Sequence, residues 1–326
     1  MSSGKFKVVI TDSYHPTLDA EREEIQEINA DLILEQTKGD EDAIMAATKD
    51  ADGLIVQHAQ ITRRVIENLE KCRIIARYGV GFDNVDTVAA TERGIMVSNV
   101  PDYCIDEVSS HAIALLMQCC RKIVLLSNTI KAGRWTYKIA EPVYKLMGQN
   151  LGIVGLGRIG SAAARKGLGL GLNVQAYDPY LSETDLDVEF VDFDRLLQTS
   201  DFISLHAPLT DETYHMFGEN EFRKMKKSAF LINTARGPVV DGPALCEALE
   251  TGEIAGAGVD VMEPEPIPQD DPLLKLENFI ITPHIAWYSE ESQKLLQRET
   301  ARAVVAVLKG GKPRSLVNPE VMNVKK

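Results

Sequence analysis

The stretch "LGIVGLGRIG", residues 151–160, decides how the second half of this chain folds. An apolar run ends in three glycines, Gly155, Gly157 and Gly160, spaced G-x-G-x-x-G, and a segment rich in small residues follows. In such a strand–turn–helix unit, the glycines permit a tight turn, close approach of a pyrophosphate, and close packing of helix on strand. The N–H groups that begin the helix also favour an anion. The stretch therefore predicts a doubly wound α/β domain that binds a dinucleotide.

An acidic residue follows at the distance that such a site needs. The next apolar run, "NVQAYDP", ends at Asp178, eighteen residues after Gly160. A carboxylate there can accept hydrogen bonds from the ribose hydroxyls of the adenosine, and it would repel a 2′-phosphate. The glycines alone would also fit a tight turn without a ligand. Strand, glycines, helix and acid in this order favour NAD as the cofactor.

Composition limits the classes of protein to which the chain can belong. Its 326 residues suggest two domains, and 44% hydrophobic with 25% charged residues is typical of globular proteins. The formal net charge of −13 argues against a nucleic-acid partner, although local arginines can still bind a small anion. The apolar runs are short and no export signal is visible, so we expect no membrane contact and a cytoplasmic location. Neither the cysteines nor the scattered histidines show metal-ligand spacing, so no metal is expected.

Short apolar runs alternate with helix-like segments along both halves of the chain. Strands are predicted at residues 7–12, 30–36, 51–57, 72–80 and 94–100, and again at 151–157, 173–179, 201–208, 229–237, 256–261 and 279–284. Continuous apolar strands that alternate with helices indicate parallel sheets covered on both faces. We also expect one long buried helix over about residues 106–129, and a C-terminal helix over about 289–308 that returns to the first domain.

Three chemically active residues follow predicted strands in the second half. Arg236 lies in "NTARG", Glu265 in "MEPEP" and His284 in "TPH". Because ligands bind beyond the carboxyl ends of the strands in an open parallel sheet, these side chains are expected to meet at one edge. Taken singly, they also fit a surface ion pair, a loop acid and a loop histidine. Their joint placement favours a catalytic site.

A cation, a carboxylate and an imidazole together suit reversible hydride transfer at a carbon that bears oxygen. Arg236 can bind a substrate carboxylate and polarise the carbonyl with its planar donors. His284 can donate a proton to the carbonyl oxygen in one direction and remove it in the other. Glu265 can orient the ring of His284 and favour its protonated form.

The motifs "GLGRIG", "YDP", "NTARG", "DVMEPEP" and "TPH" occur in the order found in D-2-hydroxyacid dehydrogenases, and the whole chain resembles that family. The resemblance implies two Rossmann-like or flavodoxin-like doubly wound parallel-sheet domains with the active site in the cleft between them. Residues 1–101, completed by 289–326, would bind substrate, and residues 102–288 would bind NAD. It also implies that Arg236, Glu265 and His284 form the catalytic triad, and that the chain forms a homodimer through the NAD-binding domain.

The resemblance extends to further residues around both ligands. It implies that the cofactor site defined by the glycines and Asp178 is completed by Arg158, Ile159, His206, Pro208, Thr210, Thr234, Ala235 and Asp260, the last of which would hold the nicotinamide carboxamide. It implies that the 2-keto or 2-hydroxy acid substrate is contacted by His58, Arg77, Val80, Gly81 and Trp287.

Within the family, "YDPYLS" and "HIAWYSEES" are similar to the C-terminal-binding protein branch, which includes NAD-binding transcriptional corepressors. The alternative function is therefore an NAD(H)-regulated, corepressor-like binding protein with little turnover. The complete triad and the chain length favour an enzyme that reduces 2-keto acids. Formate oxidation is disfavoured because it needs no acid–base pair.

Trp287 carries the prediction about substrate size. Its broad apolar face should favour keto acids with a sizeable side chain over glyoxylate. The alternative is that Trp287 packs into a domain interface and touches no ligand.

Overall fold

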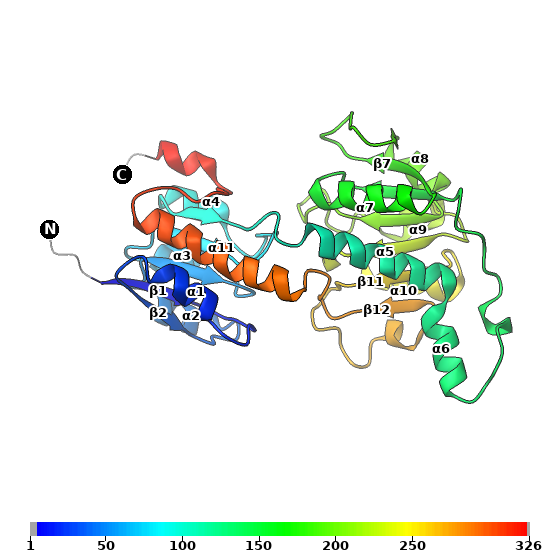
Figure 1. The fold of residues 1–326 in the computed structure, drawn as a ribbon, viewed down its shortest axis with the longest axis horizontal. Helices are drawn as coiled ribbons and strands as arrows, with labels where there is room; N and C mark the ends of the chain where they lie inside the picture. The colour runs from blue at the N-terminus through cyan, green and yellow to red at the C-terminus, as the bar shows by residue number, and fades with distance from the viewer. Residues whose placement is uncertain (1–4, 325–326) are drawn as a thin grey trace. The chain divides into compact units, whose positions relative to one another are not determined.

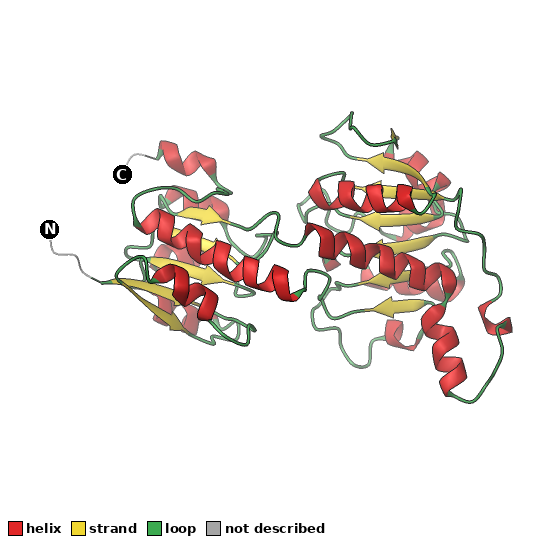
Figure 2. Ribbon diagram, in the orientation of Figure 1, coloured by secondary structure: helices red, strands yellow, loops and turns green. Residues whose placement is uncertain are grey.

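The computed structural model describes residues 5–324. The chain divides into two compact units: unit 1 comprises Met1–Tyr103 and Ser289–Lys326, and unit 2 comprises Cys104–Tyr288. Each unit contains a parallel β-sheet between two layers of helices (Figures 1 and 2). The prediction of two doubly wound parallel-sheet domains is confirmed.

Within the described residues, unit 1 is built on a five-stranded sheet with the order β2-β1-β3-β4-β5. Its strands are β1 (Phe6–Ile10), β2 (Ala30–Leu34), β3 (Gly53–Val56), β4 (Ile74–Arg77) and β5 (Met96–Ser98). Helices α1 (Asp19–Ile25) and α11 (Glu290–Leu308) pack together over one face, and α2 (Glu41–Thr48), α3 (Arg63–Asn68) and α4 (Thr87–Glu92) cover the other (Figure 1). This order is flavodoxin-like, and it reverses between β1 and β3.

The C-terminal segment is an integral part of unit 1. The buried side chain of Asn318 accepts a hydrogen bond from the Val97 N–H at 2.8 Å. Its amide nitrogen donates to Thr91 Oγ1 at 2.9 Å and to the Ile95 carbonyl at 3.0 Å. A buried polar group that loses its partner costs about 1–3 kcal/mol, so these three bonds fix the end of the chain to α4 and β5.

Unit 2 contains a seven-stranded parallel sheet with the order β12-β11-β10-β9-β6-β7-β8 among the described residues. Its strands are β6 (Asn150–Val154), β7 (Asn173–Tyr177), β8 (Val188–Phe190), β9 (Phe202–Leu205), β10 (Phe230–Asn233), β11 (Gly256–Val259) and β12 (Phe279–Ile281). Helices α5 (Ile105–Arg121) and α7 (Arg158–Gly169) cover one face, and α8 (Phe193–Thr199), α9 (Glu219–Lys224) and α10 (Gly242–Thr251) cover the other (Figure 1). The order reverses between β6 and β9, as in Rossmann domains, and a ligand is expected beyond the carboxyl ends of these strands.

The long helix predicted over residues 106–129 is interrupted. Helix α5 ends at Arg121, Lys122 takes a left-handed conformation with φ of 51°, and α6 (Ile123–Lys131) continues at an angle of 61°. A left-handed residue breaks the helical hydrogen-bond ladder, which explains the bend. Ile123 and Ile130 are exposed, so the prediction that this segment is buried was wrong for α6. In residues 5–324, no single helix is long and apolar enough to cross a membrane, although α5 and α6 together meet that test by length and composition alone.

Strand β8 was not predicted. It has three residues, Val188–Phe190, and lies at the edge of the sheet beside β7. Its middle residue is Glu189 and none of the three is fully buried. The other strands were predicted from their apolar runs, which this short edge strand lacks. Only its hydrogen-bonded pairing with β7 shows that it is a strand.

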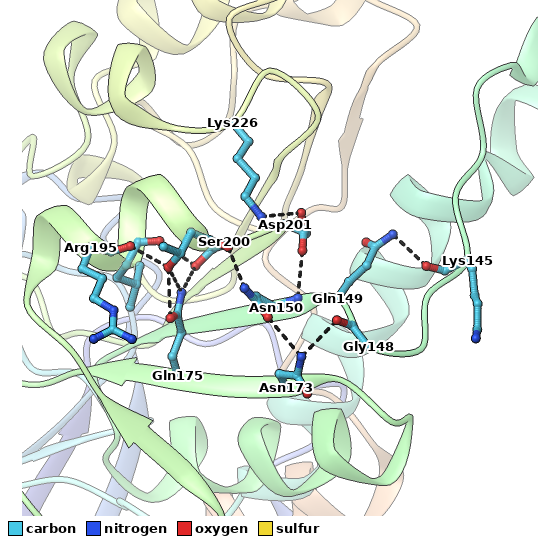
Figure 3. A network of polar contacts seen from close by, with 12 residues as sticks. Lys145, Gly148, Gln149, Asn150, Asn173, Gln175, Arg195, Ser200, Asp201 and Lys226 are labelled. Atoms are coloured by element: carbon cyan, nitrogen blue, oxygen red, sulfur yellow. Dashed lines mark hydrogen bonds and ion pairs between the residues drawn. The ribbon is translucent and has the colours of Figure 1, made fainter.

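Figure 3 shows a polar network at the amino ends of the unit 2 strands, the edge opposite their carboxyl ends. Asp201 accepts hydrogen bonds from the Asn150 N–H and from Lys226 Nζ, both at 2.8 Å. The Gln175 amide nitrogen donates to Thr199 Oγ1 and to the buried Ser200 Oγ, both also at 2.8 Å. These bonds satisfy polar groups near the starts of β6, β7 and β9, so the polar residues at this edge have a structural role.

Candidate active site

The three predicted catalytic residues follow three neighbouring strands of unit 2. Arg236 lies beyond β10, Glu265 beyond β11 and His284 beyond β12. Because β10, β11 and β12 are adjacent and parallel, their carboxyl ends lie side by side at one edge. The structure therefore brings these residues to the same edge of the sheet.

His284 and Glu265 form a close pair. His284 Nδ1 lies 2.6 Å from Glu265 Oε2, and the other carboxylate oxygen accepts the Met262 N–H at 3.1 Å. Burial alone would raise the pKa of Glu265, but the hydrogen bond and charge of His284, with help from Met262 and Arg236, hold the pKa below its ordinary value. Glu265 is thus an anion at neutral pH, and the pairing leaves His284 Nε2 as the ring nitrogen that can exchange a proton with a ligand.

The turn that carries Arg236 is fixed by the buried side chain of Asn233. The Asn233 amide nitrogen donates to the Arg236 carbonyl at 2.9 Å, and its oxygen accepts the Ala235 N–H at 3.0 Å. Arg236 Nη1 donates to the Ala235 carbonyl at 2.8 Å. A Cβ added at Gly237 would lie 2.0 Å from the Met262 carbonyl oxygen. Glycine is therefore required for this turn to approach the loop that carries Glu265.

Asp260 holds the turn that presents His284. The Asp260 side chain is buried and accepts Thr282 Oγ1 at 2.5 Å, the Ile285 N–H at 3.0 Å and the Ala286 N–H at 2.7 Å. Its backbone carbonyl accepts the His284 N–H at 2.8 Å. His284 itself has a φ of 53°, a left-handed conformation that is uncommon outside glycine. The implied contact of Asp260 with the nicotinamide carboxamide remains a prediction.

Sequence reasoning missed residues that support this turn. His111, on α5, has Nε2 2.9 Å from Thr282 Oγ1 and 3.6 Å from an Asp260 oxygen. Asn233 was likewise not singled out. Both lie in segments read as apolar helix or strand, where a single polar residue gives no signal of its own, although the "NTARG" motif does contain Asn233.

The glycine turn after β6 has the shape expected of a dinucleotide site. Gly155 has a φ of 88°, and a Cβ at Gly160 would lie 2.0 Å from the Gly155 carbonyl oxygen. A Cβ at Gly157 would meet no described atom within 4 Å, so the protein itself does not require glycine there, whereas a closely approaching pyrophosphate would. No described side chain caps the start of α7, where Arg158 and Ile159 lie, so its N–H groups can bind an anion.

Asp178 is held beside this turn. One carboxylate oxygen accepts the Leu156 N–H at 2.8 Å and the other accepts the Tyr180 N–H at 2.9 Å. Each oxygen keeps capacity for a further donor, such as a ribose hydroxyl. The geometry fits the adenosine end of NAD.

Two predicted cofactor residues have buried polar atoms without a partner in residues 5–324. These atoms are His206 Nδ1 and Thr234 Oγ1. His206 Nε2 is 2.9 Å from Ser204 Oγ, and burial lowers the pKa of His206 to about 4, so its ring is neutral. Buried polar groups are normally paired, and these atoms fit a polar ligand. The remaining predicted cofactor residues lie in the same loops: Pro208 and Thr210 after β9, and Ala235 after β10.

The predicted substrate residues of unit 1 follow β3 and β4. The His58 N–H donates to the buried carboxylate of Asp12 at 2.6 Å, and the Tyr14 ring lies 5.3 Å from the His58 ring. Asp12 and Tyr14 were not predicted, because they follow β1 and carry no family motif. Arg77 is the last residue of β4, and its Nη1 donates to the Tyr78 carbonyl. Val80 and Gly81 lie in the loop that follows, where the Asn99 amide nitrogen donates to the Val80 carbonyl at 2.6 Å.

Trp287, in unit 2, belongs to the His284 turn. Its indole N–H donates to the His284 carbonyl at 3.0 Å, and its ring lies edge-on to Tyr288 with centroids 5.6 Å apart. The indole is partly buried. In the described part of the chain, no group of three or more His, Cys, Asp or Glu residues could hold a metal ion.

Comparison with known proteins assigns the chain to a family. Residues 113–286 match the family described as D-isomer specific 2-hydroxyacid dehydrogenase, NAD binding domain. The chain is 44% identical over 304 residues to a glyoxylate reductase of Korarchaeum cryptofilum, covering 90% of this chain and 91% of that protein. It is 38% identical over 317 residues to a D-3-phosphoglycerate dehydrogenase of Methanocaldococcus jannaschii, covering 96% of this chain and 59% of that one.

Solved structures give the same result. The structure of D-lactate dehydrogenase from Aquifex aeolicus, complexed with NAD and lactic acid, matches with a TM-score of 0.86 and 30% identity, covering 95% of this chain and 99% of that one. A glyoxylate reductase from Paecilomyes thermophila matches with a TM-score of 0.87 and 28% identity, covering 97% and 99%. The full-length agreement in sequence and fold means that the chain belongs to the D-isomer specific 2-hydroxyacid dehydrogenase family and is an NAD-dependent enzyme.

Proposed function

We propose that this enzyme reduces a 2-keto acid to a D-2-hydroxy acid, with Arg236, Glu265 and His284 as its catalytic residues. The observation that carries the proposal is the 2.6 Å pair of His284 Nδ1 and Glu265 Oε2 at the strand edge shared with Arg236. Such a pair equips one ring nitrogen for proton transfer while the carboxylate holds the other. A proton donor beside a guanidinium is what reduction of a carbonyl next to a carboxylate needs.

The residues have distinct tasks in this mechanism. Arg236 binds the substrate carboxylate and polarises the keto oxygen with its planar donors. NADH, when bound, supplies the hydride. His284 donates the proton from Nε2 to the keto oxygen as it becomes a hydroxyl, and takes it back in the oxidation. Glu265 keeps the ring oriented and stabilises its positive charge.

The substrate range is the next part of the proposal. The K. cryptofilum relative is named glyoxylate reductase, as is a Thermofilum pendens relative at 39% identity, which supports glyoxylate as one substrate. Trp287 is tied to the His284 carbonyl, so its apolar ring has a fixed place beside the proton donor. We propose that this ring also binds larger aromatic, aliphatic or thioether side chains of 2-keto acids.

The C-terminal-binding protein-like segments give a second candidate. "YDPYLS" and "HIAWYSEES" support placement in that branch and hence an NAD(H)-regulated binding role. A binding protein would have no use for a proton donor tied to an anionic partner. The His284–Glu265 geometry therefore favours turnover, and a screen of NADH oxidation with a panel of 2-keto acids distinguishes the two roles.

The first prediction concerns cofactor choice. Asp178→Asn removes the negative charge but keeps an acceptor for the Leu156 N–H, so the preference for NADH over NADPH should fall about tenfold as the repulsion of the 2′-phosphate is lost. Kinetic efficiency with each cofactor measures this. The exposed acid Asp185, changed to Asn, is the matched control. A parent enzyme that uses both cofactors equally well contradicts the assignment.

The second prediction concerns the acid–base pair. His284→Asn, chosen because asparagine tolerates a left-handed backbone, should lower kcat by about a hundredfold. Glu265→Gln should retain NADH binding and shift the pH profile of kcat/KM, because the protonated imidazole loses its carboxylate partner.

Arg236→Lys should chiefly raise KM for the keto acid, since an ammonium cannot replace the bidentate fork. Glu277→Gln, an exposed acid after η3 (Pro272–Lys275), is the control, and parent-like turnover in the active-site variants at every pH would disprove the triad.

The third prediction concerns substrate size. Trp287→Ala should weaken kcat/KM for a large keto acid such as phenylpyruvate by about tenfold or more, and change that for glyoxylate much less, because only the large side chain needs the apolar wall. Trp287→Phe keeps an apolar ring but loses the indole N–H bond to the His284 carbonyl. This variant therefore tests the effect of the ring apart from that of the hydrogen bond. Equal losses on both substrates in Trp287→Ala would place Trp287 in the protein core instead.

We also propose that a second copy of this chain covers the exposed apolar surface formed by α6 and residues 132–148, named the arm. The arm exposes Trp135, Tyr137, Tyr144 and Met147, with 92% of the Trp135 surface accessible. Large exposed apolar patches are typical of association sites. Residues 132–148 run along the outside of unit 2 (Figure 1). A homodimer would bury these side chains.

The fourth prediction follows from the arm. The parent should sediment at about twice the chain mass of 36.0 kDa, and Trp135→Glu with Tyr144→Glu should shift it toward the monomer, because burying two carboxylates in an apolar contact is unfavourable. Tyr180→Glu changes a similarly exposed tyrosine outside the arm and should leave the mass unchanged. A monomeric parent contradicts the proposal.

A further inference from the structure

His215 has no task in the proposed mechanism, yet it occupies an unusual place in unit 2. It lies in the loop between β9 and α9, and its φ is 50°. For a residue other than glycine this left-handed conformation is unfavourable and persists only where surrounding contacts impose it. Its ring is also partly buried, with 33% of the side chain exposed. The contacts that impose this conformation come from two loops.

The first set of contacts joins His215 to the turn that follows Arg236. The His215 N–H donates to the Pro238 carbonyl at 2.8 Å, inside η2 (Gly237–Val239). The neighbouring Phe217 extends this contact, because its N–H donates to the Val239 carbonyl at 3.0 Å and its carbonyl accepts the Asp241 N–H at 2.9 Å. Phe217 is fully buried. The loop is therefore clamped along the backbone that begins at Arg236.

The imidazole makes the second set of contacts. Its Nδ1 lies 3.4 Å from Asp241 Oδ2, at the start of α10, and its Nε2 lies 3.1 Å from Glu263 Oε2. The Tyr214 ring stacks on it with centroids 4.0 Å apart. The two ring nitrogens therefore face carboxylates from two different segments. His215 thus links the segment after Arg236 with Glu263, two residues before Glu265.

We propose that His215 is a positioning residue that holds the Arg236 turn and the Glu265 loop in register for the reaction. The backbone of the two segments already meets at Gly237, which leaves no room for a side chain against the Met262 carbonyl. The His215 ring spans the same junction from the side and fixes Glu263 through its carboxylate. Small displacements of catalytic groups cost large factors in rate, so a link of this kind affects turnover without touching the substrate.

A plainer interpretation is that His215 makes ordinary partly exposed ion pairs, which contribute little. Two observations favour the positioning role. The backbone is held in an unfavourable conformation, and the ring joins segments that are far apart in sequence rather than neighbours on one helix. A solvated ion pair requires neither feature.

The experiment combines kinetics with amide hydrogen exchange, and it rests in part on the proposed function. His215→Asn keeps a residue that tolerates the left-handed backbone but cannot span both carboxylates. Glu263→Ala removes the partner on the Glu265 side, and the double variant completes a double-mutant cycle. Lys224→Ala, which removes an exposed pair with Asp194 at 2.8 Å, is the matched control.

The fifth prediction is that His215→Asn lowers kcat/KM for glyoxylate about tenfold while the NADH dissociation constant stays within about twofold. Exchange should rise in peptides covering 236–241 and 261–266 and stay constant in 219–226. The double variant should lose no more than the worse single variant, since both changes break one link. Lys224→Ala should behave like the parent.

The outcomes separate this inference from the proposed function. Unchanged exchange in both peptides overturns the link, and so does a double variant in which the losses multiply. Raised exchange with unchanged kcat/KM overturns the role of that link in the reaction. A fall in melting temperature without these changes would mark a merely structural ion pair. If the parent reduces no 2-keto acid, the proposed function fails, and exchange in the two peptides still decides whether His215 holds them together.

Discussion

The buried carboxylate of Asp260 is the interaction on which the geometry of the candidate active site depends. A buried charge is costly unless it is fully hydrogen-bonded, and Asp260 accepts Thr282 Oγ1 and two backbone N–H groups of the following turn. Those bonds offset the left-handed backbone of His284, which costs roughly 1–2 kcal/mol for an L-residue. Replacing this acid would leave the donors unpaired and remove the constraint that presents the imidazole.

The strand order explains why residues so distant in sequence meet. In unit 2 the strands pair in parallel, so the glycine turn, Asp178 and the loops after β9 to β12 all leave the same edge of the sheet. In unit 1 the order reverses between β1 and β3, and Asp12 after β1 holds the backbone at His58 after β3. In open α/β sheets a ligand crevice is expected where the strand order reverses.

The sequence was most informative where a function depends on local pattern. Glycine spacing and Asp178 predicted a dinucleotide turn, and the strand ends predicted that Arg236, Glu265 and His284 lie at one edge of the sheet, because parallel strands fix where their ends lie. The break at Lys122 was not predictable, since lysine readily continues a helix and the sequence gives no sign of its left-handed conformation. The roles of Asp260, Asp12 and His215 likewise depend on contacts with segments distant in sequence, which no local pattern records.

The surroundings of Glu265 stabilise both its ionised form and the folded chain at neutral pH. Burial opposes ionisation of Glu265, yet His284 and Arg236 reverse that effect and the pKa lies below its ordinary value. A carboxylate with a depressed folded-state pKa stabilises the fold above its unfolded pKa of about 4.3, and this contribution is lost as pH falls through the lower folded value. At neutral pH the Glu265 anion is therefore stabilised by His284 and Arg236, the two residues proposed to act on the substrate. Replacing His284 or Arg236 should therefore raise the pKa of Glu265 as well as disturb the proposed chemistry, whereas His215 contacts Glu263 and Asp241 instead.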